Sequence, residues 1–259
     1  MGELQEYTKA VGFPYSDQIL LSFIGGSQMH GAKIHDTDDT DWYGVFIEPP
    51  EKILGTDSYE HFVFTTGGER GGNRSSDTDV CLYSLKKWAH LVCKGNPSVL
   101  HFLFAAPVFE HILWAKMTLK KEVFVAKSHL GAFLGYANAQ MSRLLNQRGQ
   151  KNCHRPFLEE QYGYDTKYAM HITRLLGEAR ELMETGSITL PRPNKELLID
   201  IRLGKFKLHE LVQMNNQLEV EAIAAKEKSP LPETVDRSRI SELTAQTYLE
   251  YWEWKRSQP

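Results

Sequence analysis

The sequence lacks long hydrophobic runs and any strong excess of charge, and both absences limit what the protein can be. No stretch reaches the roughly 18 consecutive apolar residues of a membrane-spanning helix, so we expect no membrane span. The net charge of -3 over 259 residues gives no global attraction to nucleic acid, so an RNA contact would need a local basic patch. Residues 1–6 are acidic and polar, unlike a secretory signal peptide. These features predict a cytoplasmic protein.

Cysteine is scarce, and two common nucleotide-binding patterns are missing. Cys81, Cys93 and Cys153 are an odd number without the spacing of a metal site, so we expect reduced, packed thiols. The absence of a G-x-x-x-x-G-K-[ST] pattern excludes a Walker-type ATPase as far as a motif can. The glycines of residues 67–72 follow no convincing strand and do not fit the dinucleotide-binding fingerprint.

A glycine-serine turn is followed in the chain by a pair of aspartates. The apolar residues 19–24 predict a buried strand that ends in this turn. Backbone N–H groups in such a turn can approach a phosphate closely, which makes Gly26 and Ser27 candidate phosphate contacts. Asp39 and Asp41 open the next apolar strand, and side chains two residues apart lie on the same face of a strand. Paired carboxylates beside a phosphate-binding turn suit metal-assisted phosphoryl transfer.

A solvated acidic turn is the alternative interpretation of this region, which also contains Asp36 and Asp38. A calcium-binding EF-hand loop would need glycine at its sixth position and glutamate at its twelfth. Counted from Asp39 the sixth residue is Gly44 but the twelfth is a proline, and counted from Asp36 neither requirement is met. Asp39 and Asp41 directly adjoin the apolar strand that would hold them rigid, which favours these two as metal ligands.

The order of strand, Gly-Ser turn, short helix and Asp-x-Asp resembles the DNA polymerase β-type nucleotidyltransferases, in which a third acidic residue follows on a later strand. Asp79 fits that position at the start of the apolar residues 80–83, and Asp77 is its rival on the same face. The closer resemblance is to the RlaP family, predicted nucleotidyltransferases named for an RNA repair pathway, and it runs from about residue 20 to about residue 240. The matching segments are Gly26-Ser27, His30-Gly31, Asp39-x-Asp41-x-x-Gly44-Val45-Phe46, Asp79, Leu85-Lys86-Lys87, Lys94-Gly95-Asn96-Pro97, Tyr164-Asp165-Thr166-Lys167, Ala169-Met170-His171, Arg174-Leu175-Leu176, Pro191-Arg192-Pro193 and Ser229-Pro230-Leu231-Pro232.

The resemblance implies an α+β fold and a metal-dependent nucleotidyltransferase. Residues 1–125 would form the catalytic mixed sheet with helices, and residues 126–259 a helical domain that closes over the nucleotide. Asp39, Asp41 and Asp79 would hold two Mg²⁺ or Mn²⁺ ions while a nucleoside monophosphate passes from an NTP to an acceptor hydroxyl. The family name indicates an RNA end as the acceptor. A small-molecule or protein acceptor, and a non-catalytic nucleotide- or RNA-binding module, remain alternatives.

A basic face is expected in the helical half. Lys167, His171 and Arg174 recur at helical spacing and therefore share one face of a helix. From spacing alone, a solvated basic face is the simplest interpretation. The resemblance instead implies that Lys167 and Arg174 contact phosphates of the nucleotide, with His171 in the same cleft. Four aromatic residues near the C-terminus would either dock on the core, the simpler interpretation, or stack on bases: Tyr248, Tyr251, Trp252 and Trp254.

Periodicity and turn residues predict the remaining elements. We expect strands at residues 19–24, 42–48, 61–64 and 80–83. We expect helices at residues 28–34, 85–93, 97–104, 135–147, 165–184, 208–226 and 240–255. The polar, glycine-rich residues 65–76 predict a mobile loop beside the active site.

Overall fold

The structure is a computed structural model of the chain, and it describes residues 3–34, 39–66, 77–145 and 155–258. The chain forms two compact units. The first, called here the sheet unit, comprises Met1–Cys93, Val99–Phe124 and Val235–Pro259. The second, the helical unit, comprises Lys94–Ser98 and Val125–Thr234. These units differ from the predicted division into 1–125 and 126–259, since the last segment of the chain belongs with the sheet.

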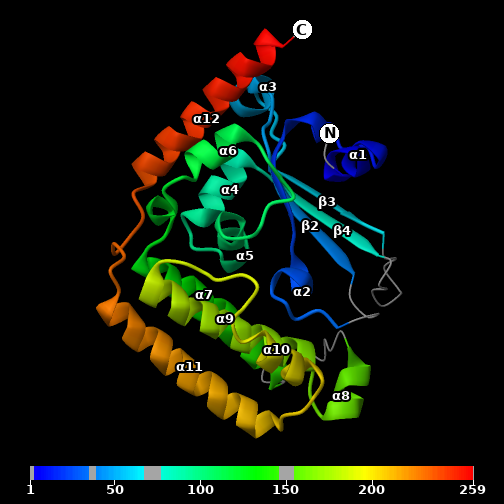
Figure 1. The fold of residues 1–259 in the computed structure, drawn as a ribbon, viewed down its shortest axis with the longest axis vertical. Helices are drawn as coiled ribbons and strands as arrows, with labels where there is room; N and C mark the ends of the chain where they lie inside the picture. The colour runs from blue at the N-terminus through cyan, green and yellow to red at the C-terminus, as the bar shows by residue number, and fades with distance from the viewer. Residues whose placement is uncertain (1–2, 35–38, 67–76, 146–154, 259) are drawn as a thin grey trace. The chain divides into compact units, whose positions relative to one another are not determined.

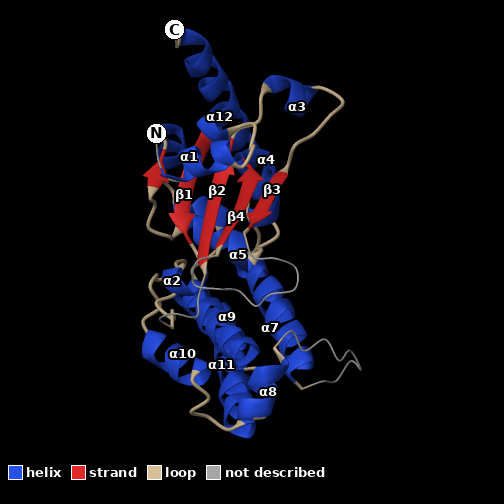
Figure 2. Ribbon diagram, turned by 90° about the vertical axis from the view of Figure 1, so that its right-hand side faces the viewer, coloured by secondary structure: helices blue, strands red, loops and turns tan. Residues whose placement is uncertain are grey.

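The sheet unit is built on a five-stranded mixed sheet in the order β3-β4-β2-β1-β5, which Figure 2 shows nearly face on. Neighbouring strands are antiparallel except β2 and β4, which are parallel. The four predicted strands are all present, and the short β5 was not predicted. The strands are β1 (Ile19–Ile24), β2 (Thr40–Phe46), β3 (His61–Thr65), β4 (Thr78–Ser84) and β5 (Phe109–Glu110).

Short helices connect these strands. The predicted helix over residues 28–34 is instead α2, which begins two residues earlier and ends at Met29 because Gly31 turns the backbone with φ of 71°. Ser84 caps α4 as expected, since its hydroxyl accepts a hydrogen bond from the Lys87 backbone N–H at 3.2 Å. The helices around the sheet are α1 (Glu3–Ala10), η1 (Ser16–Gln18), α2 (Gly26–Met29), α3 (Pro50–Leu54), α4 (Leu85–Val92), α5 (Pro97–Leu100), η2 (His101–Leu103), α6 (Ile112–Met117), η3 (Lys121–Phe124) and α12 (Arg237–Ser257).

The two faces of the sheet are covered by different helices. α1 lies on one face and α4 on the other (Figure 1). On the first face a buried cluster includes Leu4 of α1, Trp42 of β2 and Val80 of β4. On the second face, the ring of Phe102 packs against those of Phe23, Tyr43 and Tyr83. Alternate residues of β2 and β4 therefore point to the two faces, and Asp41 and Asp79 share the second face with Tyr43 and Tyr83.

The C-terminal helix α12 belongs to the sheet unit because of specific contacts with it. Tyr248 and Tyr251 are buried, as expected for docking on the core. The Tyr248 hydroxyl donates a hydrogen bond to the buried carboxylate of Glu48, just after β2. The Trp252 indole N–H donates to the Glu48 backbone oxygen at 3.0 Å. Burial raises the pKa of Glu48, an effect opposed by side-chain hydrogen bonds from Tyr248 and Ser84.

The helical unit is organised around α9, against which α7, α10 and α11 pack. The Asp165 carboxylate caps α9 by accepting hydrogen bonds from the backbone N–H groups of Lys167 at 2.9 Å and Tyr168 at 3.1 Å. Gly186, with φ of 72°, ends the helix. The long helices confirm the predicted ones to within a few residues at their ends, whereas α8 and α10 were not predicted. The elements are η4 (Lys127–His129), α7 (Leu130–Leu144), α8 (Pro156–Tyr162), α9 (Thr166–Thr185), α10 (Lys195–Arg202) and α11 (Leu208–Lys228).

Some sequence predictions fall outside the described residues. These include most of the predicted mobile loop, residues 67–76, and also Asp36, Asp38 and Cys153. Within the part of the chain that the structure describes, every helix is too short or too polar to span a membrane.

Candidate active site

Three carboxylates gather at one end of the sheet. Ligand oxygens of Asp39, Asp41 and Asp79 all lie within 4.8 Å of one another, and the three residues are half-buried. The strand register produces this arrangement, because β2 and β4 run parallel and Asp41 is the direct partner of Asp79. Asp39 immediately precedes β2. The structure thus brings together the three residues that the sequence pattern selected.

Asp77, the sequence rival of Asp79, takes a different role. Its backbone oxygen accepts a hydrogen bond from the Thr40 backbone N–H at 2.9 Å, which extends the β2–β4 ladder by one step. The group of ligand atoms that lie within 4.8 Å of one another contains Asp79 and not Asp77.

The glycine-serine turn lies directly beside Asp41. The Gly25 backbone N–H donates a hydrogen bond to the Asp41 backbone oxygen at 2.8 Å. Gly26 has φ of 56°, and a Cβ atom at this position would lie 1.8 Å from Asp41 Oδ2. Glycine is therefore required at position 26 for two reasons, the left-handed backbone and the adjoining carboxylate. Ser27, half-buried, follows it as the second residue of α2.

A fourth residue of this site was missed in the sequence. The Thr65 hydroxyl donates a hydrogen bond to Asp79 Oδ1. Thr65 is the last residue of β3 and the direct partner of Asp79 in the antiparallel β3–β4 pair. A hydroxyl that holds one carboxylate oxygen fixes the direction of the other, as outer partners do for metal-ligating groups. The only signal in the sequence was the end of an apolar run, which does not reveal the strand pairing.

In the helical unit, the predicted basic face is neither solvated nor uniformly basic. Arg174 is 8% exposed, and its Nη1 donates to both carboxylate oxygens of Glu178, at 3.0 and 2.9 Å. Glu178 is fully buried. Lys167 is half-buried in the first turn of α9. The interpretation as a solvated face is thus wrong for Arg174, which forms a buried ion pair with the glutamate one helical turn further along α9.

His171 lies among several cations. Burial, together with the charges of Arg174, Arg155, Lys167 and Arg202, lowers the pKa of His171 to about 3. The imidazole is therefore neutral near pH 7. Arg155 and Arg202 were not predicted as part of this group. Arg174 and Arg155 are paired with the carboxylates of Glu178 and Asp165, so the net positive charge of the group is smaller than four cations alone would give.

Arg155 also contacts the start of α9. Its Nη1 lies 3.0 Å from Asp165 Oδ2, and Asp165 is 1% exposed. The Arg155 guanidinium lies over the ring of Tyr168, 5.5 Å from its centroid. The Asp165 carboxylate that caps α9 thus also holds Arg155 in place.

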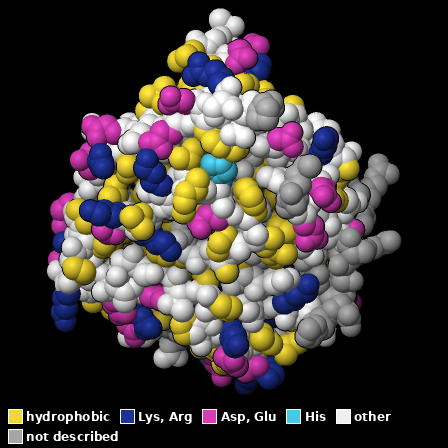
Figure 3. Space-filling model, turned by 45° about the horizontal axis from the view of Figure 1, so that its top comes forward, with side chains coloured by type: hydrophobic (Ala, Val, Ile, Leu, Met, Phe, Trp, Pro, Cys, Tyr) yellow, Lys and Arg dark blue, Asp and Glu magenta, His cyan; other side chains and the backbone are white. Residues whose placement is uncertain are grey.

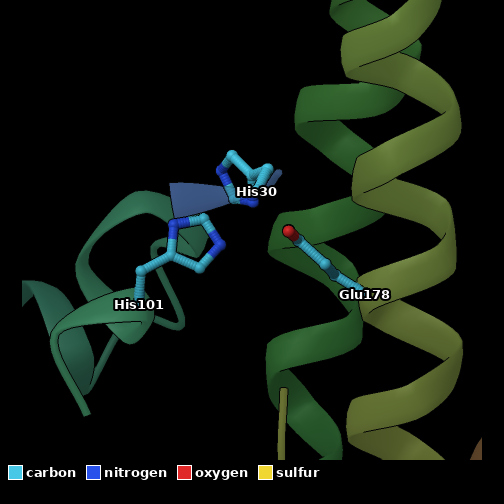
Figure 4. A group of neighbouring side chains, drawn as sticks. All are labelled: His30, His101 and Glu178. Atoms are coloured by element: carbon cyan, nitrogen blue, oxygen red, sulfur yellow. The ribbon is translucent and has the colours of Figure 1, made fainter. Parts of the chain in front are cut away.

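His30, one of the residues that resemble the family, packs against another histidine of the sheet unit. The His30 and His101 rings meet edge to face, with centroids 4.9 Å apart and an angle of 71° between their planes. Figure 4 shows the two side chains next to each other. Both residues are buried. His30 follows α2, and this contact anchors the segment that carries Gly26 and Ser27.

A cavity of about 710 Å³ in the sheet unit lies away from the carboxylates. Residues of α3, α4 and α12 line it, among them Leu54, Lys86, Arg237 and Trp252. Asp79 is near the start of β4 and Lys86 follows its end, so roughly 17 Å of strand separates the two regions. The cavity is therefore not the candidate active site. On the face of the molecule that Figure 3 presents, side chains of both charges are interspersed with hydrophobic ones.

Comparison with family models agrees with the sequence resemblance. The model of the RNA repair pathway DNA polymerase beta family, RlaP, matches residues 1–248. Among solved structures, the chain is similar to a nucleotidyltransferase-like protein from Exiguobacterium sibiricum 255-15, with 13% sequence identity and a TM-score of 0.31. That match covers 96% of this chain and 89% of the other. No curated protein matches the chain significantly.

Proposed function

We propose that this chain, which belongs to the RNA repair pathway DNA polymerase beta family, transfers a nucleoside monophosphate from an NTP to an acceptor hydroxyl with the help of metal ions. Family and fold indicate a polymerase β-type nucleotidyltransferase. The metal dependence, the NTP and an RNA end as the acceptor are the proposed parts. The cluster of Asp39, Asp41 and Asp79 beside the Gly26-Ser27 turn supports the metal dependence and the NTP. The RNA acceptor rests on the description of the family.

The residues of the cluster fit divalent metal ions. Three carboxylates offer hard oxygen ligands of the kind that Mg²⁺ and Mn²⁺ prefer. Like charges whose oxygens lie within 4.8 Å repel one another unless a cation or a proton compensates them. Asp39, Asp41 and Asp79 would hold two ions. When bound, such ions supply Lewis-acid stabilisation of the triphosphate charge and lower the pKa of the acceptor hydroxyl.

The chain's own residues supply binding and orientation. The absence of a side chain at Gly26 lets the Asp41 carboxylate pack directly against the turn, which keeps this candidate metal ligand beside the backbone N–H groups proposed to bind the phosphates. Ser27 offers its hydroxyl and backbone N–H to the phosphates. Thr65 holds one oxygen of Asp79, and the other oxygen is then directed to accept the proton of the acceptor hydroxyl.

In the helical unit we propose that Lys167, His171 and Arg174 contact phosphate groups. The support is local to that unit: cations surround a neutral imidazole, and the Glu178 carboxylate fixes the Arg174 guanidinium. A guanidinium that is already held loses less side-chain entropy when it binds an anion.

A transfer assay tests the proposed function. The protein is incubated with each α-³²P-labelled NTP, with Mg²⁺, Mn²⁺ or EDTA, and with or without a single-stranded RNA oligonucleotide. We expect metal-dependent labelling of the RNA, and a loss of at least about 10³-fold in Asp41→Asn, because a metal ligand is removed. Asp57→Asn is the matched control, since the side chain of Asp57 is 77% exposed and pairs with Lys52.

The same assay separates the alternatives. Label on the protein itself, or on small molecules only, would replace RNA as the acceptor while keeping the reaction. A purified, folded protein that labels nothing with any NTP and metal would contradict the proposed function. Equal transfer by Asp41→Asn and wild type would remove the metal assignment.

A further inference from the structure

The sheet edge next to the carboxylates carries a row of exposed side chains that the proposed chemistry does not yet use. Residues directly opposite each other in an antiparallel pair share a face, so His61 and Tyr83, Val63 and Cys81, and Thr65 and Asp79 all lie on the same side of β3 and β4. On β3 every residue of this set is exposed, and Val63 is 61% exposed. We call His61, Val63, Cys81 and Tyr83 the edge platform.

The edge platform ends in a stacked pair of rings. The imidazole of His61 lies parallel to the Tyr83 ring, with centroids 4.6 Å apart and an angle of 4° between planes. The inner neighbour of Tyr83 is Phe102, at a centroid distance of 5.9 Å. Tyr83 meets Phe102 at an angle of 57°, so the stacked pair is His61 and Tyr83, and His61 is its exposed member.

Polar contacts fix the imidazole of His61. Its Nε2 lies 3.2 Å from Cys81 Sγ. Burial, and to a smaller degree the charge of Lys87, lowers the pKa of His61, so the ring is neutral near pH 7. The His61 imidazole is fixed by its contacts with Cys81 and Tyr83, and it lies at the surface. Such a ring is suited to stacking on another aromatic ring.

The row leads directly to the catalytic cluster. From His61 to Thr65 the strand rises by about 13 Å. Thr65 contacts Asp79, so the row ends at the carboxylate proposed to accept the acceptor's proton. β3 is the edge strand of the sheet, and beyond it no further strand is paired among the described residues.

We propose that the edge platform is the acceptor subsite, where a base of single-stranded RNA stacks on His61 while the terminal hydroxyl lies at Asp79. The exposed Val63 contacts the sugar and base between these two points. Histidine and other aromatic rings serve as stacking surfaces for unpaired bases in RNA-binding proteins. This inference rests on the proposed function for the direction of the strand, but the stacking itself can be measured without catalysis.

Fluorescence anisotropy with a 5′-fluorescein-labelled single-stranded RNA decamer, without NTP, tests the stacking. We expect His61→Ala to weaken RNA binding by at least about fivefold, the lower end of the range for loss of one stacked base. His61→Phe restores the flat ring and is expected to bind within about twofold of wild type. His209→Ala, an exposed histidine of α11, is the matched control and should bind as wild type does.

Two further measurements distinguish a platform on β3 from a general loss of RNA affinity. Val63→Glu changes an exposed residue, so the fold should survive, and the added charge should weaken RNA binding by repelling the phosphates. In the transfer assay, His61→Ala should raise KM for RNA and leave KM for NTP unchanged.

The outcomes for the platform and for the proposed function are distinct. Equal RNA binding by His61→Ala and wild type, failure of His61→Phe to restore it, or no RNA binding by wild type would overturn the platform, even if metal-dependent transfer is observed. An increase in KM for NTP alone would assign the ring to the incoming nucleotide and also overturn it. If RNA binding depends on His61 but no transfer occurs, the platform stands and the proposed function fails.

Discussion

The two charged clusters of this protein differ in how their charges are arranged. One gathers charges of the same sign, and the other pairs positive with negative charges. In the sheet unit, Asp39, Asp41 and Asp79 bring charges of one sign to within 4.8 Å of one another, and all three stay half-exposed. In the helical unit, Arg174 pairs with Glu178, and Arg155 pairs with Asp165. Both of these carboxylates are buried.

The acidic cluster consists of carboxylates alone, whereas these buried carboxylates of the helical unit are each paired with an arginine. Repulsion within the acidic cluster costs stability unless a cation or a proton compensates it, which supports the proposed metal binding. The buried ion pairs of the helical unit satisfy much of their own charge and fix the guanidinium groups in place. Removing a group should therefore impair chemistry in the first cluster, and binding or folding in the second.

The largest effect after loss of a metal ligand is expected at Gly26. In Gly26→Ala, the Cβ atom would lie 1.8 Å from Asp41 Oδ2, so the carboxylate or the turn must move. Displacement of about 1 Å can cost on the order of 10²-fold in rate, and we expect a loss of transfer of this size. Single-turnover kinetics measures it.

Gly135→Ala is the matched control for this prediction, since a Cβ atom there would meet nothing within 4 Å. It lies inside α7, where alanine should stabilise the protein by about 0.5–1 kcal/mol. Unchanged transfer by Gly26→Ala would show that the position of Asp41 is not critical.

A smaller effect is expected at Lys167. Its ammonium group is proposed to meet a phosphate, and a hydrogen bond to a charged group contributes about 1.5–3 kcal/mol. We therefore expect Lys167→Ala to raise KM for NTP by about tenfold or more, with little change in melting temperature. Steady-state kinetics over a range of NTP concentrations measures this.

Lys195→Ala controls for the loss of one positive charge from the helical unit, since the Lys195 side chain is 49% exposed and lies in α10. If both variants raise KM equally, the effect comes from net charge. If neither variant raises KM for NTP, Lys167 does not contact the phosphates.

The smallest expected effect concerns folding. His129 precedes α7, is 1% exposed, and neither ring nitrogen has a hydrogen-bond partner among the described residues. Burial lowers the pKa of His129 to about 4. The unfolded chain then binds more protons than the folded one below about pH 6.5, so this group's contribution to stability is lost as the pH falls from 6.5 towards 4.

Between pH 7.5 and pH 5 the wild type should lose about 2 kcal/mol from this one group. His129→Leu should reduce that loss and raise stability at pH 7.5 by about 1 kcal/mol, because it removes unsatisfied polar atoms. Urea unfolding at both pH values measures the difference. The same pH slope in both proteins would place the acid sensitivity elsewhere.

The sequence was sufficient for the elements whose signal is local. Apolar runs identified β1, β2 and β4, and helical spacing identified α4 and α9. The spacing of Asp39 and Asp41 at the start of a strand selected these two carboxylates, and the family resemblance added Asp79. Their proposed roles remain predictions that the geometry supports.

Features that depend on pairing between distant segments could not be predicted. Thr65 meets Asp79 only through the β3–β4 register, and β5 is a two-residue strand that pairs with β1. Docking of the α12 aromatic residues on the core was expected, but their partner was not, since Tyr248 contacts Glu48, two hundred residues away in the chain. Glu178 was missed although it has a local signal, since a glutamate four residues after an arginine on a helix can pair with it.

Metal binding by the acidic cluster is the central claim, and a Mn²⁺ titration tests it most directly. Free Mn²⁺ is followed by electron paramagnetic resonance in the presence of a non-hydrolysable NTP analogue, for wild type, Asp41→Asn and Asp57→Asn. We predict that wild type and Asp57→Asn bind Mn²⁺ equally, and that Asp41→Asn binds it at least about tenfold more weakly, since a ligand oxygen is lost. Equal binding by all three proteins, or no binding by wild type, would contradict this claim.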